Sequence, residues 1–263
     1  MTAGPEEVKA CCAAAYSRDA VALVLGESYH PGGLALTRRL ADALELRAGD
    51  QVADVASGPG TTARLLAAEY GVTVDGVELG ADTVRRARSA ADDAGMSGRV
   101  RFHHGDAERL PLPDAAADAV VCECALCTFP RKEDAVAEFA RVLRPGGRVG
   151  LTDVTIDEGL LPAELTTLAA WVACVAGAQP VRRYGELLTG AGLRVIRTER
   201  HDDAIRRMSE QVDARVRVLR MTGADRLAAA GIDADVVLRY AALVRQAVAD
   251  GALGYALLVA EKA

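Results

Sequence analysis

Two glycines and an acid stand at positions where a nucleotide-like ligand would need them. Gly58 and Gly60 lie in a turn that follows an apolar stretch, residues 52–55, and precedes a predicted helix from Thr61. Glycine has no side chain, so the backbone can approach a ligand closely, and the next helix presents unpaired N–H groups. Glu78 ends the following apolar stretch, at about the 20-residue distance where an acid binds a ribose diol. The pattern predicts a site for a ribose-bearing cofactor.

The glycine-rich turn alone does not distinguish this chain from a dinucleotide-binding protein. The third glycine of the GxGxxG pattern is missing, however, and two further segments follow, HHGDAERLP at 103–111 and RVLRPGGRV at 141–149. Together these segments resemble the class I S-adenosylmethionine-dependent methyltransferases over about residues 45–155. An NAD-dependent enzyme is the alternative interpretation.

The resemblance implies S-adenosyl-L-methionine as the cofactor. Glu78 would accept both ribose hydroxyls, and Asp106 would accept the adenine amino group beside the N–H of Ala107. Taken singly, each of these acids is also typical of a turn or a helix cap. The predicted cofactor-binding residues are Tyr16, Asp54, Ser57, Gly58, Gly60, Glu78, Leu79, Asp106, Ala107 and Glu123.

Three cysteines follow the predicted fourth strand, where a methyltransferase of this class presents its acceptor. Cys122, Cys124 and Cys127 form a C-x-C-x-x-C pattern in VVCECALCTFP. Free cysteine is often a buried small residue, which is the simplest interpretation. A closed zinc site would need a second cluster with regular spacing, and the sequence has none.

The cysteine segments resemble a narrower family, the arsenite S-adenosylmethionine methyltransferases. Cys124 matches the cysteine of a segment like V-S-N-C-V-I-N-L, and Cys174 in WVACVAGA matches that of W-G-E-C-L-G-G-A. The resemblance implies that Cys124 and Cys174 bind trivalent arsenic, a soft centre that thiolates bind well, and hold it for methylation. Cys12, or its neighbour Cys11, is a hypothetical third thiol, and a thiol reductant is an expected partner.

The chain also departs from that family. The loop at 29–33 lacks the expected cysteine, and Glu123 replaces an asparagine, which places a carboxylate near the sulfonium. The alternative function is methyl transfer to a quinone- or polyketide-like carbon or oxygen, which would need a base such as His30 or Glu123. A non-catalytic metalloid sensor is a third possibility. His30 has no evident acid partner in the sequence, so we expect an ordinary loop histidine.

Alternating strand and helix patterns predict an α/β fold with a doubly wound, mostly parallel seven-stranded sheet and a helical insert or cap near the C-terminus. We expect an N-terminal helical segment and loop (1–45), a cofactor-binding core (46–200) and the insert with the last strand (201–263). The predicted strands are 51–55, 73–78, 100–104, 118–123, 148–154, 192–200 and 254–262. The predicted helices are 34–46, 61–70, 81–94, 131–143 and a long one from Pro162 to about Ala178, with two or three more within 203–250.

Composition narrows the class of protein. The chain has 263 residues, 51% of them hydrophobic, and a net charge of −6. No basic patch suggests a nucleic-acid partner, and no apolar run reaches membrane-spanning length. We therefore expect a cytoplasmic protein with a small-molecule or metalloid substrate and neither a nucleic-acid nor a membrane partner. In that compartment its cysteines are expected to be free thiols or ligands.

Overall fold

The computed structural model describes residues 9, 19–26, 29–157, 159–166, 174–175 and 177–263. Strands alternate with helices through most of this range. The strands are β1 (Gln51–Val55), β2 (Thr73–Glu78), β3 (Val100–His104), β4 (Ala117–Glu123), β5 (Leu143–Ile156), β6 (Leu193–Arg200) and β7 (Leu253–Lys262). The α-helices are α2 (Asp19–Leu25), α3 (Gly33–Leu44), α4 (Thr61–Glu69), α5 (Ala81–Asp93), α6 (Lys132–Val142), α8 (Val181–Gly190), α9 (Asp202–Thr222), α10 (Ala224–Ala229) and α11 (Ala234–Ala249), with 3-10 turns η1 (Leu126–Thr128) and η2 (Ala163–Thr166).

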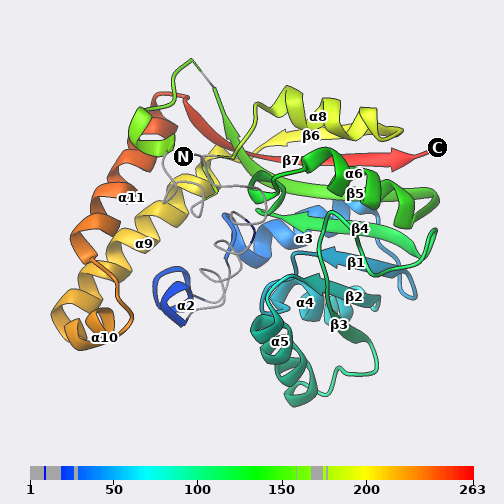
Figure 1. Cartoon of the computed structure of the whole chain (residues 1–263), viewed down its shortest axis with the longest axis horizontal. Coiled ribbons are helices and arrows are strands. Elements are labelled where there is room, and N and C mark those ends of the chain that lie inside the picture. The colour runs from blue at the N-terminus through cyan, green and yellow to red at the C-terminus, as the bar shows by residue number, and fades with distance from the viewer. Residues whose placement is uncertain (1–8, 10–18, 27–28, 158, 167–173, 176) are drawn as a thin grey trace.

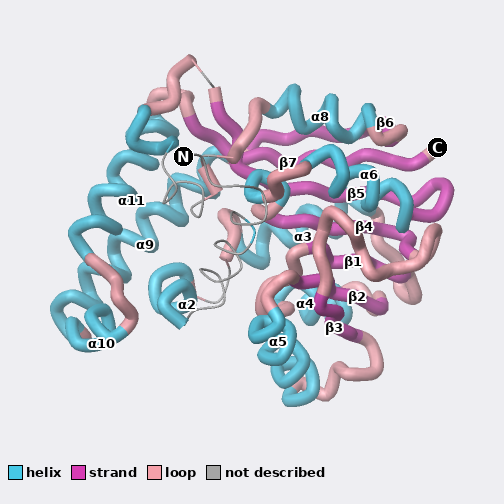
Figure 2. Tube along the Cα trace, viewed as in Figure 1, coloured by secondary structure: helices cyan, strands magenta, loops and turns pink. Residues whose placement is uncertain are grey.

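One seven-stranded sheet organises the molecule, in the order β3-β2-β1-β4-β5-β7-β6 (Figure 1). The first five strands in this order pair in parallel, whereas β7 runs antiparallel to both β5 and β6. Helices lie on both faces of the sheet, as the tube view shows (Figure 2). The predicted α/β fold with a mostly parallel sheet is therefore confirmed.

Each face of the sheet has its own apolar core. On one face, leucines of α3 and α4, such as Leu40 and Leu66, pack on strand residues such as Val121 of β4. On the other face, α6 and α8 cover a second set that includes Phe139 and Leu188. Because the central strands are buried on both sides, they read as nearly continuous apolar runs in the sequence.

Two predicted boundaries were wrong. The fifth strand begins at Leu143 rather than near residue 148, because the Pro145-Gly146-Gly147 turn lies within an extended segment that pairs Ala117 with Leu143. The predicted helix from Pro162 cannot extend to Ala178, because Cys174 lies in a turn with φ of 64°, and the described residues near its start form a 3-10 turn at Ala163–Thr166. Left-handed backbone at a non-glycine residue is incompatible with continued helix. Most of the intervening segment is outside the described residues.

The C-terminal insert consists of three helices, α9, α10 and α11, which confirms the predicted helical content of 203–250. Helix α9 packs against α11, β7 and α2. That this insert forms a cap over the cofactor cleft remains a prediction. In the part of the chain that is described, we find no helix with the length and apolarity needed to cross a bilayer.

Candidate functional site

Parallel pairing brings the predicted cofactor residues to one edge of the sheet. In β1, Asp54 lies opposite Gly76 of β2 and Val121 of β4. The three strands therefore end side by side, and the loops that follow them surround one pocket. Among the described residues, this pocket is lined by all but one of the predicted cofactor-binding residues. Those that line it are Asp54, Ser57, Gly58, Glu78, Leu79, Asp106, Ala107 and Glu123.

The exception is Gly60, which lies in the same turn but packs on the core residue Phe102 rather than lining the pocket. Both turn glycines have left-handed backbone, with φ of 52° at Gly58 and 75° at Gly60. A Cβ at Gly60 would lie 2.2 Å from Cζ of the buried Phe102, whereas a Cβ at Gly58 would meet nothing within 4 Å. Gly58 thus leaves open space beside the pocket, and Gly60 lets the turn pack on the sheet.

The Glu78 carboxylate is held by the backbone of the surrounding loops. It accepts hydrogen bonds from the N–H of Gly58 at 3.1 Å and of Gly80 at 2.8 Å. Burial raises the pKa of Glu78, and the bonds from the loop N–H groups oppose that shift. The carboxylate therefore links the glycine turn to the end of β2 while it faces the pocket.

Two buried polar atoms at this edge have no hydrogen-bond partner among the described residues. They are Oδ2 of Asp54 and Oγ of Ser57. Burial raises the pKa of Asp54 well above its ordinary value, and the nearby carboxylates of Glu123 and Glu78 add to the effect. Buried polar atoms are normally paired, so orphaned atoms that line a pocket suit a polar ligand. A cationic ligand would also offset the repulsion among the three carboxylates.

Asp106 already has a cationic partner. Lys9 Nζ lies 2.7 Å from Oδ2 of Asp106 and also pairs with Glu108. The other Asp106 oxygen accepts the N–H of Glu108 at 2.9 Å. Burial opposes ionisation of Asp106, but these bonds outweigh it and lower its pKa. Lys9 lines the same pocket, so any ligand that bonds to Asp106 must share it with this lysine.

Glu123 and His30 form an acid–histidine pair, so His30 has the acid partner that was not evident in the sequence. Nε2 of His30 is 3.5 Å from Oε2 of Glu123, and the two side chains are 9% and 4% exposed. The same carboxylate accepts the hydroxyl of Thr62 at 2.7 Å and that of Thr37 at 3.1 Å. His30 and Glu123 both line the pocket. The ring nitrogens also have other neighbours, since Nδ1 lies 3.3 Å from the carbonyl oxygen of Pro31 and Nε2 lies 3.3 Å from the hydroxyl of Thr37. A histidine beside a carboxylate is a common arrangement of a general base.

The two cysteines that were expected to meet do so. The Sγ of Cys174 donates to the carbonyl oxygen of Cys124 at 3.4 Å, and the two side chains are also hydrogen-bonded. The bond to Cys174, together with burial, holds the pKa of the Cys124 thiol well above its ordinary value. Both residues have left-handed backbone, with φ of 53° and 64°, a conformation that is uncommon for cysteine. Cys124 also lines the cofactor pocket.

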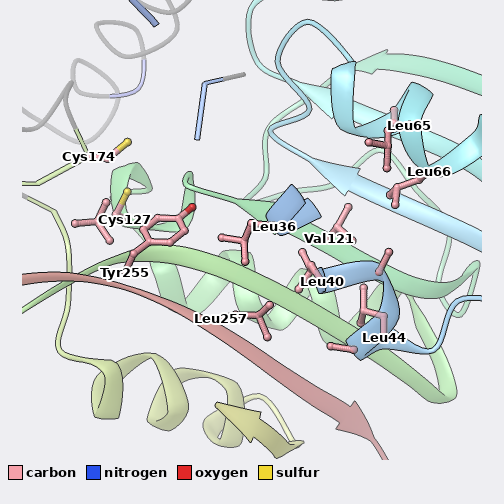
Figure 3. Packing of buried hydrophobic residues seen from close by; sticks show 14 of the residues in the cluster. Leu36, Leu40, Leu44, Leu65, Leu66, Val121, Cys127, Cys174, Tyr255 and Leu257 are labelled. Atoms are coloured by element: carbon pink, nitrogen blue, oxygen red, sulfur yellow. The ribbon is translucent and has the colours of Figure 1, made fainter. Parts of the chain in front are cut away.

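Cys127, which the sequence left without a role, joins this pair. Its side chain is hydrogen-bonded to Cys174, and Figure 3 shows the two sulfur atoms near one another beside Tyr255. The N–H of Cys127 donates to Asp153 Oδ2 at 2.9 Å. Burial raises the pKa of this fully buried aspartate to about 7. Cys122 is buried in β4 and fits the simplest interpretation of a small core residue.

Some predicted site residues lie outside the described residues, namely Cys12 with its neighbour Cys11, and Tyr16. Within the described residues, no group of three or more His, Cys, Asp or Glu side chains is arranged to hold a metal ion. The thiols of Cys124, Cys127 and Cys174 are therefore a hydrogen-bonded group rather than a preformed metal site.

Residues 53–151 match the methyltransferase domain family. The chain is 42% identical over 118 residues to a 27-O-demethylrifamycin SV methyltransferase of Amycolatopsis mediterranei, an alignment that covers 45% of this chain and 43% of that protein. It is 38% identical over 105 residues to a ubiquinone/menaquinone biosynthesis C-methyltransferase of Stutzerimonas stutzeri, covering 39% and 41% of the two chains. The chain thus spans less than half the length of these two relatives.

The fold is that of solved methyltransferases. A phosphoethanolamine N-methyltransferase 2 of Haemonchus contortus, solved in complex with S-adenosyl-L-methionine, superposes with a TM-score of 0.80 at 19% identity, covering 93% of this chain and 56% of that one. The resemblance to class I methyltransferases is therefore confirmed for fold and domain, and the predicted cofactor is the one that homologues bind. None of the three relatives described here is an arsenite methyltransferase.

Proposed function

We propose that the protein transfers the methyl group of S-adenosyl-L-methionine to an ionisable oxygen or carbon of a small organic molecule. The observation that carries this proposal is the His30–Glu123 pair on the wall of the pocket. An organic hydroxyl or carbon acid must lose a proton as it is methylated, and this pair is placed to take it. The names of the relatives, which include a rifamycin O-methyltransferase and a quinone C-methyltransferase, support the same class of acceptor.

The residues of the pocket fit the cofactor. Its sulfonium supplies an electrophilic methyl group. The orphaned oxygen of Asp54 suits the cofactor's ammonium group, and the fixed carboxylate of Glu78 suits a ribose diol. Asp106 would bind the adenine amino group while it keeps its contact with Lys9.

Within the acid–histidine pair, each group has a distinct task. Glu123 is held in place by the hydroxyls of Thr37 and Thr62, so its carboxylate orients the imidazole and stabilises it once protonated. His30 then holds the proton that leaves the acceptor. Because both side chains are buried, little water competes for that proton.

The test is the substitution His30→Gln, assayed with radiolabelled S-adenosyl-L-methionine and a panel of phenols and reduced quinones. We expect kcat to fall by about 100-fold or more, the usual contribution of a general base, with cofactor affinity within twofold of wild type. His103→Gln is the matched control, since His103 also pairs with a carboxylate, Asp75, but does not line the pocket. Full activity of His30→Gln would overturn the assignment of the base.

A second candidate acceptor is trivalent arsenic, which the grouping of Cys124, Cys127 and Cys174 favours. Each As–S bond would replace an As–OH bond, and the thiol proton would leave with the hydroxide as water. No separate base would be needed, since the arsenic lone pair would form the As–C bond while the methyl–sulfur bond breaks and S-adenosylhomocysteine leaves. A thiol reductant would keep the cysteines reduced.

One variant separates the two candidates. Cys174→Ser should abolish methylation of arsenite or methylarsenite and leave methylation of an organic acceptor intact. Loss of both activities would be compatible only with misfolding, which the binding of S-adenosylhomocysteine by calorimetry detects. Methylation of arsenic by the variant would exclude the thiol-bound substrate.

A further inference from the structure

A second cavity, of about 1160 Å³, lies beside the cofactor pocket. This open cavity is lined mainly by residues of α3, α9 and the end of α2. Among the described residues, His30 is the one that lines both cavities. The imidazole therefore lies between the two cavities. The volume slightly exceeds the range of about 300–1,000 Å³ that is common for small-molecule sites.

One face of α9 presents polar side chains to this cavity. Arg207, Gln211 and Arg215 are spaced four residues apart and all line it. Residues with this spacing share a helix face, and two such steps extend about 12 Å along the axis. The three side chains therefore form a polar row, which we call the α9 row.

The two arginines of the α9 row are weakly engaged by the protein itself. Arg215 donates to the carbonyl oxygen of Val24 at 3.0 Å and has no carboxylate partner among the described residues. Arg207 is 3.6 Å from the carboxylate of Asp203, and both of these side chains are largely exposed. In a protein with a net charge of −6, two such guanidinium groups on one cavity wall favour an anionic ligand.

The other two arginines of the cavity differ from these. Arg39 donates two hydrogen bonds to the carboxylate of Glu199, and Arg200 donates to both oxygens of Asp202. These ion pairs balance the charges of Arg39 and Arg200, so the two side chains line the cavity without being available to bind an anion. The cationic character of the cavity is concentrated on α9.

We propose that this cavity is the acceptor site and that the α9 row binds a carboxylate or phosphate group of the acceptor. This inference rests on the proposed function, because it assigns His30 as the base at the inner end of the site. The acceptor would then carry an anionic group at one end and an ionisable hydroxyl or carbon at the other. Guanidinium groups suit this task because they bind planar or tetrahedral oxyanions through two N–H groups.

The direct test is calorimetric titration of the whole protein with inorganic pyrophosphate, with S-adenosylhomocysteine titrated separately to verify folding. We expect Arg215→Gln and Arg207→Gln each to weaken pyrophosphate binding about tenfold, the effect of losing one charge-assisted contact. Arg217→Gln, on the same helix but away from the cavity lining, should bind like wild type. Absence of pyrophosphate binding by wild type, or equal weakening in Arg217→Gln, would overturn the proposal.

A second measurement separates this inference from the proposed function. The assay compares 3,4-dihydroxybenzoate with its neutral methyl ester as methyl acceptors. We expect the acid to have the lower KM in wild type and to lose that advantage in Arg215→Gln, with kcat unchanged. Equal KM values for acid and ester would refute the anionic site and leave methyl transfer standing. If neither compound is methylated, the proposed function fails for this class, while the pyrophosphate titration still decides the anion site.

Discussion

Replacement of Gly60 by alanine should destabilise the protein strongly, because two separate penalties act at this position. The backbone has φ of 75°, where an L-residue costs about 1–2 kcal/mol. The new Cβ would also lie 2.2 Å from the ring of Phe102, which is 3% exposed and packed in the core. Overpacking of a core costs about 1–3 kcal/mol. The sum is about 2–5 kcal/mol, a large part of the total of about 5–15 kcal/mol for a native protein.

The assay is urea denaturation followed by circular dichroism, with Gly146→Ala as the control. Gly146 has nearly the same φ, 76°, but a Cβ there would meet nothing within 4 Å. Gly146→Ala should therefore cost only the backbone strain, and the difference between the two variants measures the contact with Phe102. In a Phe102→Leu background, the additional cost of Gly60→Ala should shrink. If Gly60→Ala costs no more than Gly146→Ala, the packing argument is wrong.

Four further substitutions probe the site. Glu78→Gln should weaken S-adenosylhomocysteine binding at least about tenfold by calorimetry, because charge-assisted bonds to the ribose are lost; unchanged affinity would remove Glu78 from the cofactor site. Glu123→Gln should lower kcat and leave cofactor affinity nearly unchanged, and a change confined to cofactor affinity would contradict its role in orienting His30. The folded-state pKa of Asp153 is about 7, above its ordinary value, so the folded protein keeps this group protonated at pH values where the unfolded chain loses the proton. The resulting stability is complete below the unfolded-state pKa and is lost as pH rises through about 7. Asp153→Asn should therefore flatten the fall in unfolding free energy between about pH 4 and 7 that denaturation of wild type shows, and an unchanged pH slope would refute this. Cys127→Ser should lower arsenite affinity, measured by calorimetry, only if the second candidate acceptor is correct.

The sheet could be predicted from the sequence because its signals are local. β2 and β3 match the expected ranges at both ends, since each is a short segment in which buried apolar residues are interspersed with polar ones and which is bounded by turn residues or charged residues. The C-terminal end of the helix predicted from Pro162 to Ala178 was misjudged for the opposite reason. Its apolar spacing is helical, but the left-handed backbone at Cys174 depends on tertiary contacts that spacing does not record.

The candidate site was only partly predictable. Asp54, Glu78 and Glu123 end three strands, so parallel pairing alone brings them together. The contact between His30 and Glu123 depends on where α3 and its preceding loop lie on the sheet, and no local pattern encodes that placement. The hydrogen bond from Thr37 to Glu123 joins residues 86 positions apart, so it too depends on the placement of α3 and is not encoded by a local pattern. Asp153 was missed because it lies within strand β5, and only its burial and its contact with Cys127 distinguish it.

The position of β7 between β5 and β6 also constrains how the chain can fold. Strand β6 is joined to the rest of the sheet only through β7, which lies at the far end of the sequence. During synthesis, β6 emerges from the ribosome about 60 residues before the strand it must pair with. Until then the edge of β5, which includes the buried Leu151 and Val154, stays open to other strands. A nascent chain arrested before Leu253 should therefore be prone to aggregation and be a substrate for chaperones.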